Sequence, residues 1–386
     1  MKKVLSVFIA VCVMLMTSVT TFAAEAPTLE KVEEQINGAV KYLTDSVASY
    51  GVDDALDFYI ISENMEDIDK YADGFLNDVK ANLDANGGKI VSSYGENLAT
   101  YGAVISILID LGEDPADFNG YNIETAFLAM DPTVEPASPS YYRAIVQGAF
   151  YCEADESIEF IEKVCDTYVE KYYTMGQGVD YYGYSCDNTA YFIETLSFAY
   201  LVSDKYDSVL EDAIQVLDTY NVDGGYCFNP QYGTQPNANS TALALMAHSA
   251  YISEDMEDFD GYFDLVNGIY ADLCTFEGSG AGIFTYEDQD DKSATHDALM
   301  ALSYYYIDVL MQQDFEGEDP TEEDTTAAEE NNETTTTTAP AEATATAKTN
   351  TSKKSPSTGS ETMAVSASIA LLSAAGVLAV LKRKVK

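Results

Sequence analysis

Tryptophan is absent from this sequence of 386 residues, histidine occurs twice, and basic residues are few. Nineteen Lys and Arg stand against 65 Asp and Glu, so the formal net charge is −46 at neutral pH. A surface this acidic repels the phosphate backbone of nucleic acids, which proteins hold through basic patches. DNA and RNA are therefore excluded as partners, and histidine chemistry is limited to His248 and His296.

Cysteine is also scarce, with six residues at irregular spacing, the first of them Cys12 inside an N-terminal apolar run. Such spacing fits no metal-binding framework, so we expect buried thiols, no metal and no cofactor. Disulfide pairing stays open. Tyrosine is abundant, with 29 residues. Aromatic contacts to a ligand therefore have to come from Tyr and Phe.

The N-terminus has the pattern of a secretory signal peptide. Lys2 and Lys3 precede an apolar run over residues 4–16, and small residues follow up to Ala24. This order of a basic, an apolar and a small-residue region predicts a signal peptide over residues 1–23. A retained membrane anchor is the alternative, although the run is shorter than the ~20 apolar residues of a spanning helix.

The C-terminus combines three features. Residues 355–359 read Ser-Pro-Ser-Thr-Gly, a nearly uncharged stretch follows over 363–381, and a basic tail ends the chain. The stretch is long enough to span a bilayer, with the cations on the cytoplasmic side. Residues 355–386 thus resemble the cell-wall sorting signal of Gram-positive bacteria. The resemblance implies that a sortase cuts between Thr358 and Gly359 and joins Thr358 to peptidoglycan.

This resemblance predicts a secreted protein anchored to the cell wall, which meets the membrane only through a transient C-terminal helix. Ser355 stands where Leu is commoner, so the class of sortase stays open. A plain C-terminal membrane anchor is the alternative. Residues 314–354 are rich in Thr, Ala and Glu and poor in large apolar residues. Such a composition cannot bury enough surface to offset the entropy of ordering, which predicts a disordered stalk.

The remaining body, residues 24–313, is built from a repeat. Residues 61–71 return as a close copy at 252–262. Apolar segments with helical periodicity recur at intervals of about fifty residues, and their anchor residues are Tyr50, Thr100, Tyr142, Thr189, Thr241 and Thr295. The pattern predicts an all-α body of six helical hairpins. Its anchored helices are apolar nearly all round, so we expect them inside a ring with more amphipathic helices outside.

Gly-Gly-Tyr at 224–226, followed by Asn-Ser-Thr-Ala-Leu-Ala-Leu at 239–245, carries a second resemblance. These residues resemble the prenyltransferase and squalene-cyclase repeat, and the likeness extends over about residues 28–312. It implies the (α/α)6 toroid that terpenoid cyclases, protein prenyltransferases, cobalamin carriers and complement thioester domains share.

The catalytic motifs of these relatives are incomplete in this sequence. Residues 185–190 match the Asp-x-Asp-Asp-Thr-Ala run of the cyclases, but Asp187 is the one acid of the three that is kept. Of the three zinc-ligand positions implied by the prenyltransferases, His296 alone keeps a ligand, whereas catalytic zinc takes three protein ligands. The thioester segment is missing. The hypotheses of a prenyltransferase and of a corrinoid carrier therefore rank below the two that follow.

Aromatic residues concentrate in the loops that precede the last three anchored helices. Loops on one rim of a toroid converge on its centre, and Tyr combines apolar area with a polar tip. We therefore predict ligand binding by the rim residues Tyr181, Tyr184, Tyr226, Phe228, Tyr232, Phe284, Tyr286 and His296. The leading hypothesis is a non-catalytic surface protein that binds an unidentified extracellular glycan, peptide or small molecule. Aromatic packing that closes the rim is the alternative.

The second hypothesis is a surface hydrolase or lyase with paired carboxylates. Acid-base cleavage needs two carboxyl groups facing each other across a cavity. Asp187 and Asp297 are the best candidates because both lie near the start of an anchored helix. The alternative is a structural role, in which Asp187, Asn188, Ser240 and Ser293 cap the N-termini of these helices. His248 is expected to be a tolerated inner-face residue, and residues 287–291 a solvated acidic loop.

Overall fold

The computed structural model describes residues 27–310, apart from residues 66, 153, 155 and 252–258. The predicted signal peptide, stalk and sorting segment, with Thr358 and Gly359, lie outside the described residues. Within the described part the chain is mostly helical, with three short β-hairpins, which confirms the all-α prediction. None of its helices has both the length and the apolar character needed to cross a membrane.

Two series of helices alternate along the described chain. The first series comprises α3 (Ala55–Ser62), α5 (Leu98–Asp110), α7 (Tyr141–Tyr151), α9 (Cys186–Tyr200), α11 (Ala238–Ala250) and α13 (Lys292–Tyr304). The second comprises α2 (Leu29–Thr44), α4 (Asp69–Ala85), α6 (Ile123–Leu128), α8 (Ser157–Tyr172), α10 (Asp207–Asp218) and α12 (Phe259–Cys274). Three short helical turns, η1 (Val52–Asp54), η2 (Asp204–Tyr206) and the π-helical η3 (Tyr305–Leu310), adjoin them.

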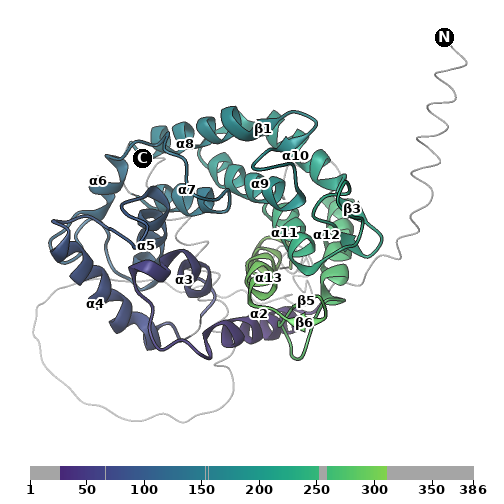
Figure 1. Cartoon of the computed structure of the whole chain (residues 1–386), viewed down its shortest axis with the longest axis horizontal. Helices are drawn as coiled ribbons and strands as arrows, with labels where there is room; N and C mark the ends of the chain where they lie inside the picture. The colour runs from purple at the N-terminus through teal and green to yellow at the C-terminus, as the bar shows by residue number, and fades with distance from the viewer. Residues whose placement is uncertain (1–26, 66, 153, 155, 252–258, 311–386) are drawn as a thin grey trace, which may run out of the picture.

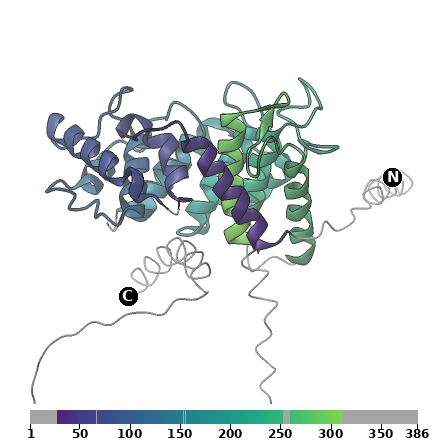
Figure 2. The same cartoon turned by 90° about the horizontal axis from the view of Figure 1, so that it is seen from below.

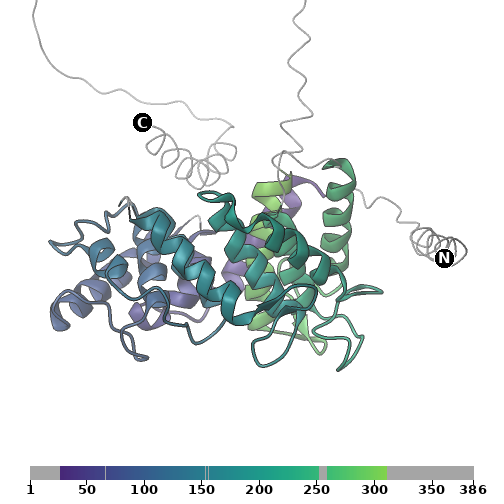
Figure 3. The ribbon, with the colours of Figure 1, turned by 90° about the horizontal axis from the view of Figure 1, so that it is seen from above.

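The first series lies inside the second around a common centre (Figure 1). Each helix of the inner series packs against the next, from α3 through α5, α7, α9 and α11 to α13. Helix α13 in turn contacts α2 and α3, so the two ends of the described chain meet. Edge-on views show a body that is wider than it is deep (Figures 2 and 3).

Burial explains why the two series differ in sequence. Helix α5 is apolar nearly all round, and its residues 98–108 are all buried, because neighbours cover it on several sides. Helix α10 buries a stripe that contains Leu210, Ala213 and Leu217 and exposes its other face. An apolar surface of this width fits an inner position, and a single stripe fits an outer one.

The β-hairpins join outer helices to inner helices. They are β1 with β2 (Tyr173–Thr174 and Gly178–Val179), β3 with β4 (Asn221–Val222 and Gly225–Tyr226), and β5 with β6 (Thr285–Tyr286 and Gln289–Asp290). The Tyr226 amide donates to Thr241 Oγ1 at 3.0 Å. Gly225 has a φ of +131°, and a Cβ there would lie 2.6 Å from the same oxygen. The Gly-Gly-aromatic motif thus seats the hairpin on the inner helix, which requires glycine.

Helices α5 and α7 approach each other through glycine. A Cβ on Gly102 would overlap the backbone carbonyl of Ala144. We expect Gly102→Ala to lower the free energy of unfolding by about 1–3 kcal/mol, since overpacking displaces backbone. Gly268→Ala on α12 is the control, because its Cβ meets nothing within 4 Å and Ala stabilises a helix. Chemical denaturation of both variants measures the difference, and equal effects would contradict the close approach.

A cluster of buried charges lies where α3, α7, α9 and α13 meet. The Arg143 side chain, 5% exposed, forms ion pairs with Glu63 and with fully buried Glu194. The ring of Tyr59 lies 5.0 Å from its guanidinium carbon, and Tyr304 donates to Glu194 Oε1 at 2.9 Å. Burial raises the pKa of Glu194 to about 7, while the charge of Arg143 acts against this rise. One cation thus compensates carboxyl groups from two other helices.

Candidate functional site

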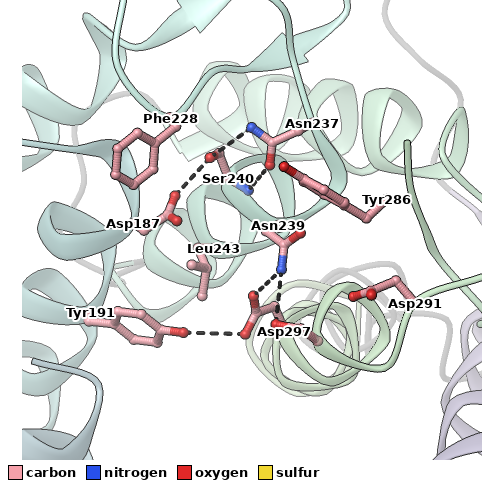
Figure 4. Close-up of a pocket in the computed structure, with 11 residues that line it drawn as sticks. Asp187, Tyr191, Phe228, Asn237, Asn239, Ser240, Leu243, Tyr286, Asp291 and Asp297 are labelled. Atoms are coloured by element: carbon pink, nitrogen blue, oxygen red, sulfur yellow. Dashed lines mark hydrogen bonds between the residues drawn. The ribbon is translucent and has the colours of Figure 1, made fainter. Parts of the chain in front are cut away.

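A cavity of about 540 Å³ lies at the N-terminal ends of α9, α11 and α13. These helices are adjacent inner helices, so side chains from the first turns of all three meet there. The loops before α11 and α13 complete the walls (Figure 4). The lining residues are Asp187, Tyr191, Phe228, Asn237, Asn239, Ser240, Leu243, Tyr286, Asp291, Ser293 and Asp297.

Other residues cap these helices, which leaves the Asp187 and Asp297 carboxyl groups available to this cavity. The Ser185 hydroxyl caps α9 by accepting from the Asn188 amide at 3.1 Å. In the same way, Asn237 caps α11 and Asp291 caps α13. Their side-chain oxygens accept from the backbone amides of Ser240 and Ala294, each at 2.9 Å. The predicted caps Asp187, Asn188, Ser240 and Ser293 are therefore wrong, because residues that precede them hold that position.

Asp187 is held by a chain of hydrogen bonds. The Asn237 amide donates to Ser240 Oγ at 3.1 Å, and that hydroxyl donates to Asp187 Oδ1 at 2.7 Å (Figure 4). Burial raises the pKa of Asp187 to about 7; the charge of Asp297 adds to the rise and the Ser240 hydrogen bond opposes it. A carboxyl group in this environment exchanges its proton near neutral pH.

Asp297 has different surroundings. Its Oδ1 accepts from the Tyr191 hydroxyl at 3.2 Å, and its Oδ2 accepts from the Asn239 amide at 2.7 Å (Figure 4). Both oxygens therefore accept a hydrogen bond from a neighbouring helix, which fixes the orientation of this side chain. Burial, with the charge of Asp297 adding, holds the pKa of Tyr191 well above its usual range, so this hydroxyl stays a donor at neutral pH.

Two predicted rim aromatics line the cavity. Phe228 is 47% exposed and Tyr286 is 52% exposed, so both rings present free faces at its mouth. Tyr232, 78% exposed, follows on the same loop as Phe228. Tyr181 and Tyr184 are not among the lining residues; the Tyr181 hydroxyl donates to the Ala137 carbonyl at 2.8 Å.

Two predicted ligand contacts are wrong. Tyr226 and Phe284 are fully buried, because each hairpin turns its aromatic ring into the core while its backbone bonds to the inner helix. The Tyr226 hydroxyl meets His248 Nε2 at 3.2 Å, and the other ring nitrogen of His248 lies 2.8 Å from the Tyr262 hydroxyl. His248 is therefore packed between its own helix α11, strand β4 and the outer helix α12.

His296 adjoins the cavity without lining it. Its Nδ1 lies 3.9 Å from Asp297 Oδ1, and its Nε2 is buried with no hydrogen-bond partner. In the described part of the chain, no group of three or more His, Cys, Asp or Glu residues is arranged to hold a metal ion. The cysteines there are present as thiols, buried except for the partly exposed Cys274.

Sequence reasoning named Asp187 and Asp297 but missed the partners that orient them. Tyr191 lies four residues after Asp187, so helical periodicity places both on one face of α9, and this spacing was the available signal. For Asn237 and Asn239 the sequence contained no such signal, because their contacts depend on how α11 is rotated against α9 and α13.

No protein-family model and no curated protein matches the sequence. The structure is similar to that of a solved polysaccharide lyase, with a TM-score of 0.50 and 12% sequence identity. The match covers 72% of this chain and 96% of the other. At this level of sequence identity, the likeness shows a similar fold and nothing more. A helical fold of this kind is compatible with a toroid.

Proposed function

We propose that this chain forms an (α/α)6 toroid and is a glycan-cleaving enzyme that acts in the cavity at the starts of α9, α11 and α13. One observation carries the proposal. Two carboxyl groups, Asp187 and Asp297, line the same cavity in unlike environments. Two carboxyl groups that line one cavity, one of them with a raised pKa, can serve as the acid and the base that cleave a glycosidic bond.

Hydrolysis divides the work between the two groups. Asp187, whose pKa is raised to about 7, donates its proton to the glycosidic oxygen as the bond to the anomeric carbon breaks. Asp297 accepts a proton from a water molecule whose oxygen bonds to that carbon. Tyr191 and Asn239 fix the orientation of Asp297 through their hydrogen bonds. The exposed faces of Phe228 and Tyr286 offer stacking surfaces to sugar rings.

Eliminative cleavage is the second candidate, favoured by the Tyr191 hydroxyl beside Asp297 and by the likeness to a polysaccharide lyase. A base then takes a proton from the carbon next to a uronate carboxylate. The bond from the adjacent carbon to the glycosidic oxygen breaks as a carbon–carbon double bond forms, and the leaving oxygen takes up a proton. Hydrolysis accounts better for a cavity whose lining residues include carboxylates but no Lys, Arg or His to bind that uronate.

Turnover on a panel of polysaccharides tests the proposal. The full chain is expected to release new reducing ends from at least one polymer. Mass spectrometry then separates the reactions, because hydrolysis adds water to the products and elimination leaves an unsaturated sugar. Binding of a polymer without any product would contradict cleavage and would support the hypothesis of a non-catalytic, ligand-binding protein.

We further propose that the protein is exported and joined to peptidoglycan through Thr358. The support is the sequence pattern of residues 355–386. Deleting residues 355–359 is expected to move the protein from the wall fraction to the membrane fraction or the medium. Unchanged wall attachment would exclude the sorting role.

Ser240→Ala provides a finer test of the acid. The Ser240 hydroxyl stabilises the charged form of Asp187, so removing it raises the pKa of Asp187 further. The alkaline limb of the activity profile is expected to move upward by about one to two pH units, since hydrogen bonds to charged groups are worth about 1.5–3 kcal/mol. Ser293→Ala is the matched control, because Ser293 lines the cavity but faces Asn239. Equal shifts in both variants would contradict the assignment.

A further inference from the structure

Among the residues that the structure describes, those that line the cavity and carry a charge are acidic. Asp187, Asp291 and Asp297 are among its lining residues, and no Lys, Arg or His is. The turn between β5 and β6 adds the exposed Glu287 and Asp288 beside Tyr286. The remaining polar lining groups are neutral amides and hydroxyls from Asn237, Asn239, Ser240, Ser293 and Tyr191.

Two described basic residues, Lys292 on α13 and Arg143 on α7, have their partners outside the cavity. Lys292 follows Asp291 in sequence, but its Nζ donates to Ser46 Oγ at 3.4 Å, beyond the end of α2. Arg143 is buried between Glu63 and Glu194. An acidic sugar in the cavity would therefore meet like charges without a basic partner among the described lining residues, and such juxtaposition strongly opposes binding.

We propose that the site selects glycans that carry no carboxylate or sulfate groups, namely neutral or amine-bearing polysaccharides, and rejects polyuronates. This inference rests on the proposed function and adds its substrate class. Amides, hydroxyls and two exposed aromatic faces suit sugar hydroxyls and ring faces. The carboxylates of Asp291 and Asp297 favour a protonated amine and oppose an anion, and Asp187 carries no positive charge in either protonation state.

The first test compares polymers that differ in charge. The full chain is assayed on polygalacturonate and its methyl-esterified form, on alginate, and on xylan, β-glucan and chitosan. Binding of matched neutral, amine-bearing and uronate oligosaccharides is measured in parallel. The expected result is cleavage of a neutral or amine-bearing polymer, with kcat/KM at least about tenfold lower on any polyuronate.

The outcomes separate the two proposals. Cleavage that favours a polyuronate overturns the charge inference and leaves glycan cleavage standing. Absence of cleavage overturns the proposed function, and the binding arm then decides the inference: tighter binding of the uronate oligosaccharide overturns it, and tighter binding of the neutral or amine-bearing one supports it. A chain that neither cleaves nor binds any of these glycans overturns both.

Asp291→Asn tests the role of charge inside the cavity. Asn caps a helix about as well as Asp, so α13 keeps its N-cap while the cavity loses one negative charge. The preference for neutral over uronate oligosaccharides is expected to fall about threefold to tenfold at low salt, and less at high salt.

Glu170→Gln is the matched control for this variant, because Glu170 is an exposed residue of the outer helix α8. It removes the same charge from the protein without touching the cavity. A similar loss of preference in both variants would show that net charge is responsible, and would overturn the assignment to the cavity.

Discussion

Asp187→Asn is expected to lower kcat on a cleavable polysaccharide by about 10²- to 10⁴-fold, the usual contribution of a general acid. The amide has nearly the same size, and its oxygen can still accept from Ser240. It cannot, however, deliver a proton to the departing oxygen. We therefore expect the free energy of unfolding to change little while the reaction slows, and the two quantities should be measured on the same preparation.

The pH dependence follows from the same group. Burial and the charge of Asp297 raise the pKa of Asp187 to about 7, and the acid works in its protonated form. Activity is therefore expected to hold below about pH 7 and to fall about tenfold for each further unit of pH. The alkaline limb should disappear in Asp187→Asn, because the group that titrates there is gone.

A change of leaving group distinguishes an acid from a residue that only shapes the cavity. Aryl glycosides with a nitrophenolate leaving group need little proton donation. Asp187→Asn is expected to retain far more activity on an aryl glycoside than on the natural linkage. Equal losses on both substrates would show that Asp187 does not act as the acid.

Local sequence encoded the helices of this structure well. Apolar residues at nearly every position of α5 and α11 marked helices that neighbours cover on several sides. The predicted anchors Thr189, Thr241 and Thr295 lie in the first turns of α9, α11 and α13. The hydroxyls of Thr241 and Thr295 accept hydrogen bonds from the backbone amides of Tyr226 and Phe284, and Gly178 lies close to the Thr189 hydroxyl. These short-range contacts explain why glycine and threonine recur at a fixed order in the repeat.

The rim was harder to predict because composition does not separate two kinds of aromatic residue. Phe284 and Tyr286 stand two positions apart, yet the first is fully buried and the second is 52% exposed. The Phe284 amide bonds to Thr295, which holds its ring against the core, whereas Tyr286 begins the turn between β5 and β6. Only the path of the hairpin decides which ring is free for a ligand.

The site itself was partly predictable. A carboxylate near the start of an inner helix was sufficient to single out Asp187 and Asp297. The contacts of Asp297 with Tyr191 and Asn239 join three helices whose residues are separated by 58 and 106 positions. Such contacts depend on the rotation of packed helices, which periodicity alone does not determine.

Arg143→Met is expected to cause the largest loss of stability, about 3–5 kcal/mol in the free energy of unfolding, because breaking a buried ion pair leaves uncompensated charge. Glu63 and Glu194 would then share the interior without their cation. Chemical denaturation measures the effect. Lys163→Met is the control, since it removes an exposed ion pair with Glu159 on α8, and such pairs contribute about 1 kcal/mol or less.

The sign of the pH dependence tests whether this deficit arises from charge or from lost packing. The pKa of Glu194 is already raised to about 7 in the folded protein, against about 4.3 for an exposed glutamate, and losing Arg143 raises it further. A carboxyl group of this kind favours folding when protonated, so its contribution is full at acidic pH and is lost as pH rises through the folded-state pKa. The deficit of Arg143→Met should therefore shrink from pH 8 to pH 5, and Arg143→Met combined with Glu194→Gln should recover part of it at pH 8. A deficit that is constant with pH, and that the second substitution does not relieve, would mean that the methionine fails to fill the space of the arginine and that the ion pairs contribute little.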